Sequence, residues 1–234
     1  MKRIFIPTTS GTDWQRLLAK PRLHWKKGAS AMTAAASWEA SDPRLPSEIS
    51  RLLDSTADPA LVDQRLVAAF PEWQVALPGG ATNSCTDVLA VCRNDRGLCV
   101  MGVEAKVEED FGPTLGEKRS AMTEAQDRRL AYLHQLLHVA HFDDGVRYQL
   151  LHRTVSALLT AQEFHASVAA MVVHAFETPK LQRDDFLAFA RAMGARELVP
   201  LVYRVPTFSR PSLYLAWCDG DVSFRRVELP SAYS

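Results

Sequence analysis

The sequence predicts an α/β protein in which helices flank a central mixed β-sheet, with a helical N-terminal part. Three observations lead to this prediction. Apolar residues recur at helical spacing through the first third of the chain, and β-rich runs joined by turns begin at Trp73. From residue 116 onward, segments with helical periodicity alternate with apolar strand-like runs.

The individual elements follow from periodicity and from start and stop signals. A hairpin is expected where two β-rich runs flank the polar turn at residues 94–97. Gly194 is expected to end a helix. The expected helices are at 30–40, 47–53, 59–70, 116–140, 146–164 and 183–193, and the expected strands at 73–77, 87–92, 98–107, 167–176 and 213–217.

Length and composition favour one domain over residues 1–234. The 47% hydrophobic and 23% charged residues exclude a disordered, collagen-like or coiled-coil chain. Within the domain we expect a mainly helical part at 1–72, a core at 73–176, and a C-terminal helix and strand at 177–234.

Charge and cysteine content restrict the environment and the partners. The 27 basic residues balance 27 acidic ones, so any attraction to nucleic acid must be local. The four cysteines form no Cys-x-x-Cys pair, and the longest apolar run, residues 168–173, is far shorter than the roughly 20 residues of a membrane helix. The N-terminal apolar run is expected to be a strand and no export signal. We expect a cytoplasmic protein without a membrane partner.

Three charged residues of the predicted hairpin carry the functional prediction. Asp87 begins one strand, and Glu104 and Lys106 lie near the end of the next. Because side chains alternate along a strand, Glu104 and Lys106 share a face on which they can meet Asp87. Two converging carboxylates suit Mg²⁺, and a neighbouring lysine can act on a phosphate or on the attacking water. Solvated strand residues are the alternative interpretation.

The segments at residues 79–90 and 102–112 resemble the PD-(D/E)xK, or restriction-endonuclease-like, nuclease superfamily, and the likeness covers about residues 73–176. The resemblance implies a restriction-endonuclease-like core. It also implies that Asp87, Glu104 and the Ala105 carbonyl bind Mg²⁺ or Mn²⁺, with Lys106 as the catalytic lysine. Thr86 stands where the superfamily has its name-giving proline.

The helix expected after the hairpin supplies two further candidates. Gln149 can orient a metal-bound water, and Arg153, four residues later, can bind a phosphate. A capped, partly exposed helix explains the same residues equally well. In the superfamily an acidic residue on an earlier helix often binds the metal too, and Glu39 is the candidate for that auxiliary ligand.

A basic segment at residues 20–27 is the candidate nucleic-acid contact outside the core, with Lys26 and Lys27 as its central cations. A solvated loop is its alternative interpretation. Three histidines at helical spacing are discounted as zinc ligands because no carboxylate or cysteine accompanies them, and three acids after the hairpin are discounted as a second metal site. These residues are His134, His138 and His141, and Glu108, Glu109 and Asp110.

The sequence therefore predicts a divalent-metal-dependent nuclease with Asp87, Glu104, Lys106 and Gln149 in its active site. DNA is expected as the substrate ahead of RNA, and a homodimer is left open. One alternative is a nucleic-acid-binding or regulatory module with a vestigial metal site. Another is a metal-dependent hydrolase of a different phosphate-containing substrate.

Overall fold

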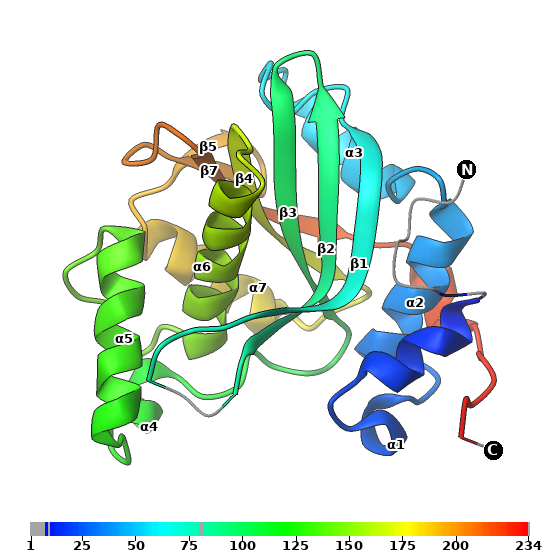
Figure 1. The fold of residues 1–234 in the computed structure, drawn as a ribbon, viewed down its shortest axis with the longest axis horizontal. Coiled ribbons are helices and arrows are strands. Elements are labelled where there is room, and N and C mark those ends of the chain that lie inside the picture. Colours follow the sequence, from blue (N-terminus) through cyan, green and yellow to red (C-terminus); the bar gives the residue numbers. More distant parts are fainter. Residues whose placement is uncertain (1–7, 9, 80–81, 234) are drawn as a thin grey trace.

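A seven-stranded sheet forms the centre of the protein in a computed structural model that describes residues 8, 10–79 and 82–233 (Figure 1). The strand order is β1-β2-β3-β4-β7-β6-β5. The strands are β1 (Arg65–Val75), β2 (Ser84–Asn94), β3 (Gly97–Lys106), β4 (Val168–Ala175), β5 (Arg196–Val199), β6 (Val202–Val205) and β7 (Ser212–Asp219).

The sheet is mixed, as the sequence predicts. Strands β1, β2 and β3 form an antiparallel meander, β3 to β4 and β4 to β7 are parallel, and β6 and β5 complete the sheet antiparallel to their neighbours. The carboxyl ends of β3, β4 and β7 therefore lie at one edge of the sheet. The charged residues Glu104 and Lys106, at the end of β3, lie at this edge.

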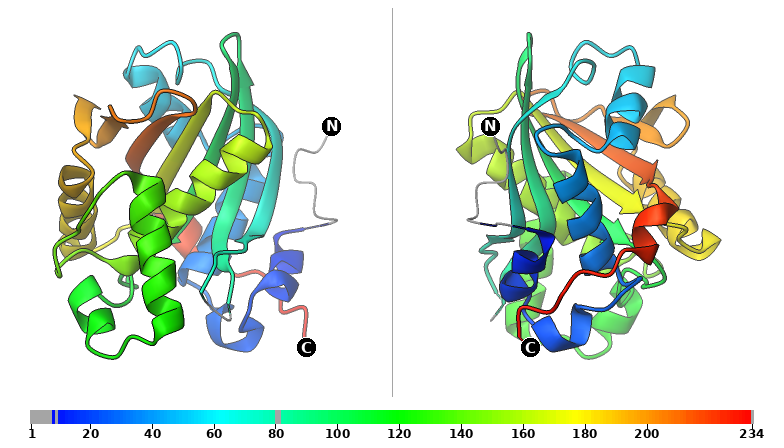
Figure 2. Two further views of the ribbon diagram at one scale, coloured as in Figure 1. Left: turned by 60° about the vertical axis from the view of Figure 1, so that its left-hand side comes forward. Right: turned by 90° about the vertical axis from the view of Figure 1, so that its right-hand side faces the viewer.

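Helices cover both faces of the sheet (Figure 2). On one face the core contains side chains from α4 (Leu115–Arg119), α5 (Glu124–Leu137), α6 (Tyr148–Glu163) and α7 (Lys180–Ala192). The opposite face is packed by η1 (Gly11–Leu17), α2 (Ser30–Ser41) and α3 (Ser47–Ser55), with α1 (Pro21–His24) and η2 (Val222–Arg226) beside α2. No described helix has the length and apolar character needed to cross a membrane.

Most of the expected elements are confirmed, and two predictions are wrong. The helix expected at 59–70 is absent, because residues 65–75 form β1, whose pairing with β2 outweighs the helical spacing of their apolar side chains. The sheet therefore begins before the expected boundary at Trp73. The helix expected at 116–140 is two helices, because Thr123 caps α5 through a reciprocal pair of hydrogen bonds with Gln126. The β5–β6 hairpin was not predicted.

The approach of α6 to the sheet depends on a glycine in β3. A Cβ atom at Gly102 would lie 3.2 Å from the Cβ atom of Ala157 on α6 and 3.6 Å from the Thr86 methyl carbon. The bare backbone therefore lets the helix pack closely against β3, two residues before Glu104.

We predict that Gly102→Val destabilises the protein by about 1–3 kcal/mol, because the added methyl groups overpack this contact. Thermal denaturation followed by circular dichroism will show a melting temperature several degrees lower. Gly145→Ala is the control, since a Cβ atom there has no neighbour within 4 Å. Equal melting temperatures for both variants would contradict close packing at Gly102.

Candidate active site

The structure brings together the three charged residues of the hairpin. The β2–β3 register pairs Val88 with Val103, and its continuation sets Asp87 beside Glu104. The Ala105 backbone N–H donates to Asp87 Oδ2 over 2.7 Å, and Lys106 Nζ donates to Glu104 Oε1 over 3.0 Å. Glu104 and Lys106 are both buried, whereas Asp87 is partly exposed.

Helix α6 supplies the other partners of Glu104. Gln149 Nε2 donates to Glu104 Oε1 over 2.6 Å, and Gln149 Oε1 accepts from Lys106 Nζ over 3.1 Å. One turn later, Arg153 Nε donates to Glu104 Oε2 over 2.5 Å. The i, i+4 spacing puts both α6 side chains over the end of β3. Both predicted α6 residues therefore belong to the same cluster as Glu104.

The Ala105 carbonyl has a direction compatible with the ligand role implied by the superfamily. The Lys106 carbonyl accepts from the Phe176 N–H over 2.8 Å, so it faces β4. Backbone groups of successive strand residues face opposite neighbours, which turns the Ala105 N–H and C=O toward Asp87. Among the described residues, no three His, Cys, Asp or Glu side chains are grouped to hold a metal. Two carboxylates and a carbonyl are a set of oxygen groups that would suit Mg²⁺ with retained waters.

Electrostatics separate the two carboxylates. Burial and the neighbouring charges of Glu104 and Glu72 raise the pKa of Asp87 well above its ordinary value. Burial would also raise the pKa of Glu104, but the cations of Arg153 and Lys106 together outweigh it and hold that pKa at about 2. Glu104 is therefore ionised at neutral pH. The same two cations, which are hydrogen-bonded to Glu104, do not offset the burial of Asp87, so its pKa stays raised.

Glu72 is a third acid at the site, and the sequence did not indicate it because the strand was expected to begin only at Trp73, one residue later. It occupies the β1 position opposite Asp87, between the pairs Pro71–Val88 and Trp73–Thr86. Its φ of 52° is in the left-handed region, an uncommon conformation for a residue with a side chain. A carboxylate oxygen accepts from the Cys85 thiol over 3.1 Å.

Two more polar residues connect β2 with α6. Ser84 Oγ lies 2.8 Å from His152 Nδ1 and accepts from Arg153 Nη1 over 3.2 Å. Burial and the Arg153 charge lower the pKa of His152 well below its ordinary value, so its imidazole is neutral. These contacts hold Arg153 against Glu104. In the sequence, one signal indicates that His152 and Arg153 share a helix face with Gln149: they follow it by three and four residues.

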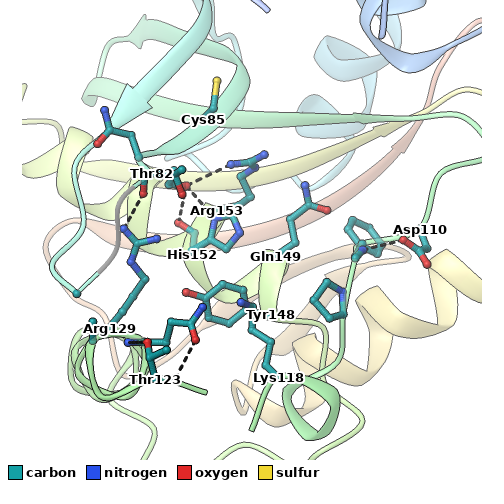
Figure 3. Close-up of a pocket in the computed structure, with 18 of the residues that line it drawn as sticks. Thr82, Cys85, Asp110, Lys118, Thr123, Arg129, Tyr148, Gln149, His152 and Arg153 are labelled. Atoms are coloured by element: carbon teal, nitrogen blue, oxygen red, sulfur yellow. Dashed lines mark hydrogen bonds between the residues drawn. The ribbon is translucent and has the colours of Figure 1, made fainter. Parts of the chain in front are cut away.

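A cavity of about 830 Å³ lies beside the cluster (Figure 3). Lys106, Gln149 and Arg153 contribute to one wall, and the opposite side is formed by α4, α5 and the connection between β1 and β2. Four of its described lining residues are basic and one is acidic, namely Lys106, Lys118, Arg129, Arg153 and Asp110. The cavity therefore favours an anionic ligand.

The structure does not bring the other predicted residues to this cavity. Glu39 lies on α2, on the opposite face of the sheet, where its carboxylate accepts from Trp14 Nε1 over 2.8 Å. The prediction of Glu39 as an auxiliary ligand does not fit this position, because the sheet separates it from Asp87. Lys26 and Lys27 follow α1, also on the α2 side, and Lys27 Nζ lies 3.8 Å from Glu228. They do not line the cavity.

The discounted acids and histidines have structural contacts. Glu109 accepts from the backbone N–H groups of Ser30 and Val107, and Glu108 pairs with Arg225. His138 ends α5 and stacks on Phe208 with ring centroids 4.7 Å apart.

Comparison with protein families matches residues 7–222 to a family described as a domain of unknown function, DUF6946. The chain belongs to this family. No curated protein matches the DUF6946 chain. No solved structure matches it either.

The pKa of Glu72 gives this DUF6946 protein a specific pH dependence of stability. Burial raises the pKa of Glu72 from 4.5 to about 7, with a further contribution from the Glu104 charge. The folded protein therefore binds more protons than the unfolded chain between these pH values, and Glu72 lowers stability as pH rises through this window. Below pH 4.5 the carboxyl is protonated in both states and this cost is absent.

We predict that Glu72→Gln stabilises the protein at pH 8 by about 1–3 kcal/mol relative to wild type, and that the gain disappears toward pH 4.5. Urea unfolding at several pH values measures this difference. Glu228→Gln, at a side chain that is 73% exposed, is the control and will show no such trend. A gain that does not grow with pH would contradict the account of Glu72.

Proposed function

We propose that this protein is a divalent-metal-dependent nuclease that hydrolyses phosphodiester bonds, with DNA as its substrate ahead of RNA. The observation that carries the proposal is the convergence of Asp87, Glu104 and Lys106 at the end of two paired strands, beside a cation-lined cavity. The resemblance of the hairpin to the PD-(D/E)xK superfamily supports the same interpretation of these three residues.

The charge balance supports a cation at this place. Three carboxylates, those of Glu72, Asp87 and Glu104, interact with two cations, Arg153 and Lys106. Burial, together with the charges of the neighbouring acids, raises the pKa values of Glu72 and Asp87. Mg²⁺ or Mn²⁺ held by Asp87, Glu104 and the Ala105 carbonyl would supply Lewis acidity toward a phosphate oxygen and an activated water.

The side chains around the carboxylates have separate roles in this proposal. Lys106 lines the cavity and is oriented by Glu104 and Gln149, so its ammonium can stabilise charge that develops on the phosphate. Gln149 orients Lys106 and a water through its amide. Arg153 neutralises Glu104 in the resting protein and binds a substrate phosphate when that carboxylate is otherwise compensated.

We predict that the protein cleaves DNA in Mg²⁺ or Mn²⁺ and that chelator abolishes cleavage. Asp87→Asn and Lys106→Met will each lower the rate at least about a hundredfold, because each removes a charge that acts in the transition state. Lys180→Met, at an exposed lysine on α7, is the matched control and will keep full activity. The assay is cleavage of labelled DNA and RNA over time. Equal rates for wild type and both site variants would contradict the proposal.

A second candidate function is a nucleic-acid-binding or regulatory module with a vestigial metal site. The observation that favours it is the closed hydrogen bonding of Glu104, whose two oxygens are satisfied by Lys106, Gln149 and Arg153 alone. Such a network is complete without a metal. The response of the protein to metal ions distinguishes the two functions.

We predict that Mn²⁺ at ten times its dissociation constant raises the free energy of unfolding by about 1.4 kcal/mol, because the cation binds the folded state alone. Asp87→Asn will lose this response, and in chelator it will melt no lower than wild type because it removes a repelling charge. Thermal melts with and without millimolar Mn²⁺ measure both effects. A wild-type protein indifferent to Mn²⁺ would favour the vestigial site.

A further inference from the structure

The outer wall of the cavity beside Lys106 is formed by α5 and by described residues of the connection between β1 and β2 (Figure 3). Arg129 on α5 donates to the carbonyl oxygens of Leu77, Pro78 and Thr82, over distances of 2.9, 3.1 and 2.7 Å. These bonds tie the connection between β1 and β2 to α5. A Cβ atom at Gly79 would lie 2.0 Å from the Ala125 carbonyl oxygen, so the connection packs directly against the helix. A ligand therefore enters between two walls.

The outer wall contains cations that lack acidic partners. Among the ion pairs of the described residues, none includes Lys118 or Arg129. The one acidic lining residue, Asp110, lies 4.0 Å from Arg147 and accepts from the Gly112 N–H. Lys106 and Arg153 are compensated by Glu104 on the inner wall. The uncompensated positive charge is thus concentrated opposite the candidate catalytic residues.

An aromatic ring lies between the two groups of cations. Tyr148, the first residue of α6, is partly exposed in the cavity, and Lys118 Nζ lies 4.5 Å from its ring centroid. The next residue, Gln149, accepts from Lys106. A base that displaced Lys118 from the ring would leave that ammonium free for the adjacent phosphate. Cations combined with an accessible aromatic ring are the usual features of single-strand binding, and the Tyr148 ring is partly accessible here.

We propose that the cavity binds a single-stranded segment of DNA, with a base stacked on Tyr148 and the neighbouring phosphate at Lys118. This inference rests on the proposed nuclease function and names its substrate class. A continuous duplex keeps its bases stacked and paired inside, so it presents no base face to Tyr148.

The test is DNA binding in chelator, where cleavage cannot interfere. The probes are a fluorescein-labelled 12-nucleotide single strand of mixed sequence and the 12-base-pair duplex of the same sequence, followed by fluorescence anisotropy. Wild type will bind the single strand at least about tenfold more tightly than the duplex. Tyr148→Ala will weaken single-strand binding about fivefold or more, whereas Tyr148→Phe will retain it because the ring remains.

Lys118→Gln tests the phosphate contact. It will weaken single-strand binding and reduce the slope of log affinity against log salt concentration by about 0.7, the value for one lost phosphate contact. Arg96→Gln, an exposed cation at the turn between β2 and β3 at the other end of these strands, is the matched control for the loss of one charge. Melting temperatures of all variants will show that each is folded.

Equal or tighter duplex binding would overturn the inference, as would a Lys118→Gln variant indistinguishable from Arg96→Gln. Metal-dependent cleavage of duplex DNA together with that result would leave the proposed nuclease function in place. Single-strand binding that depends on Tyr148 and Lys118, without any cleavage in Mn²⁺, would support the inference and contradict the nuclease function.

Discussion

The burial of the Glu104 carboxylate is the constraint on which the site and its surroundings depend. A buried charge costs several kcal/mol unless it is paired and hydrogen-bonded. One partner, Lys106, comes from the same strand, but Gln149 and Arg153 come from α6. The helix must therefore dock on β3 in one position, and Gly102 allows it to come close enough. The packing of α6 against the sheet therefore also fixes the positions of the charged residues around Glu104.

This arrangement leaves the strand end with more acid than base. Glu104 is compensated, whereas burial and neighbouring negative charge raise the pKa values of Asp87 and Glu72. Across the cavity the imbalance is reversed, because Lys118 and Arg129 form no ion pair with an acidic side chain of the described residues. A cation at the strand end would neutralise the excess of acid there, and a phosphate would neutralise the positive charge of the outer wall. We infer that the protein is built to hold these two ligands together.

The sequence predicts the hairpin residues well because their placement depends on local rules. Strand alternation relates Glu104 to Lys106, and helical spacing relates Gln149 to Arg153. Glu72 could not be found this way, since its strand is defined by pairing with β2 and its apolar neighbours also fit a helix. The position of Glu39 depends on which face of the sheet α2 covers, and that is decided by tertiary packing. The cation-lined wall likewise results from contacts between segments far apart in the sequence.

The central claim is that Asp87 and Glu104 hold one divalent cation, and the most direct measurement is a crystal structure grown with Mn²⁺ and examined for its anomalous scattering. The account predicts an anomalous peak between the two carboxylates and the Ala105 carbonyl, with Arg153 moved away from Glu104. Crystals that contain no peak at this place, with the bond from Arg153 to Glu104 intact, would contradict it.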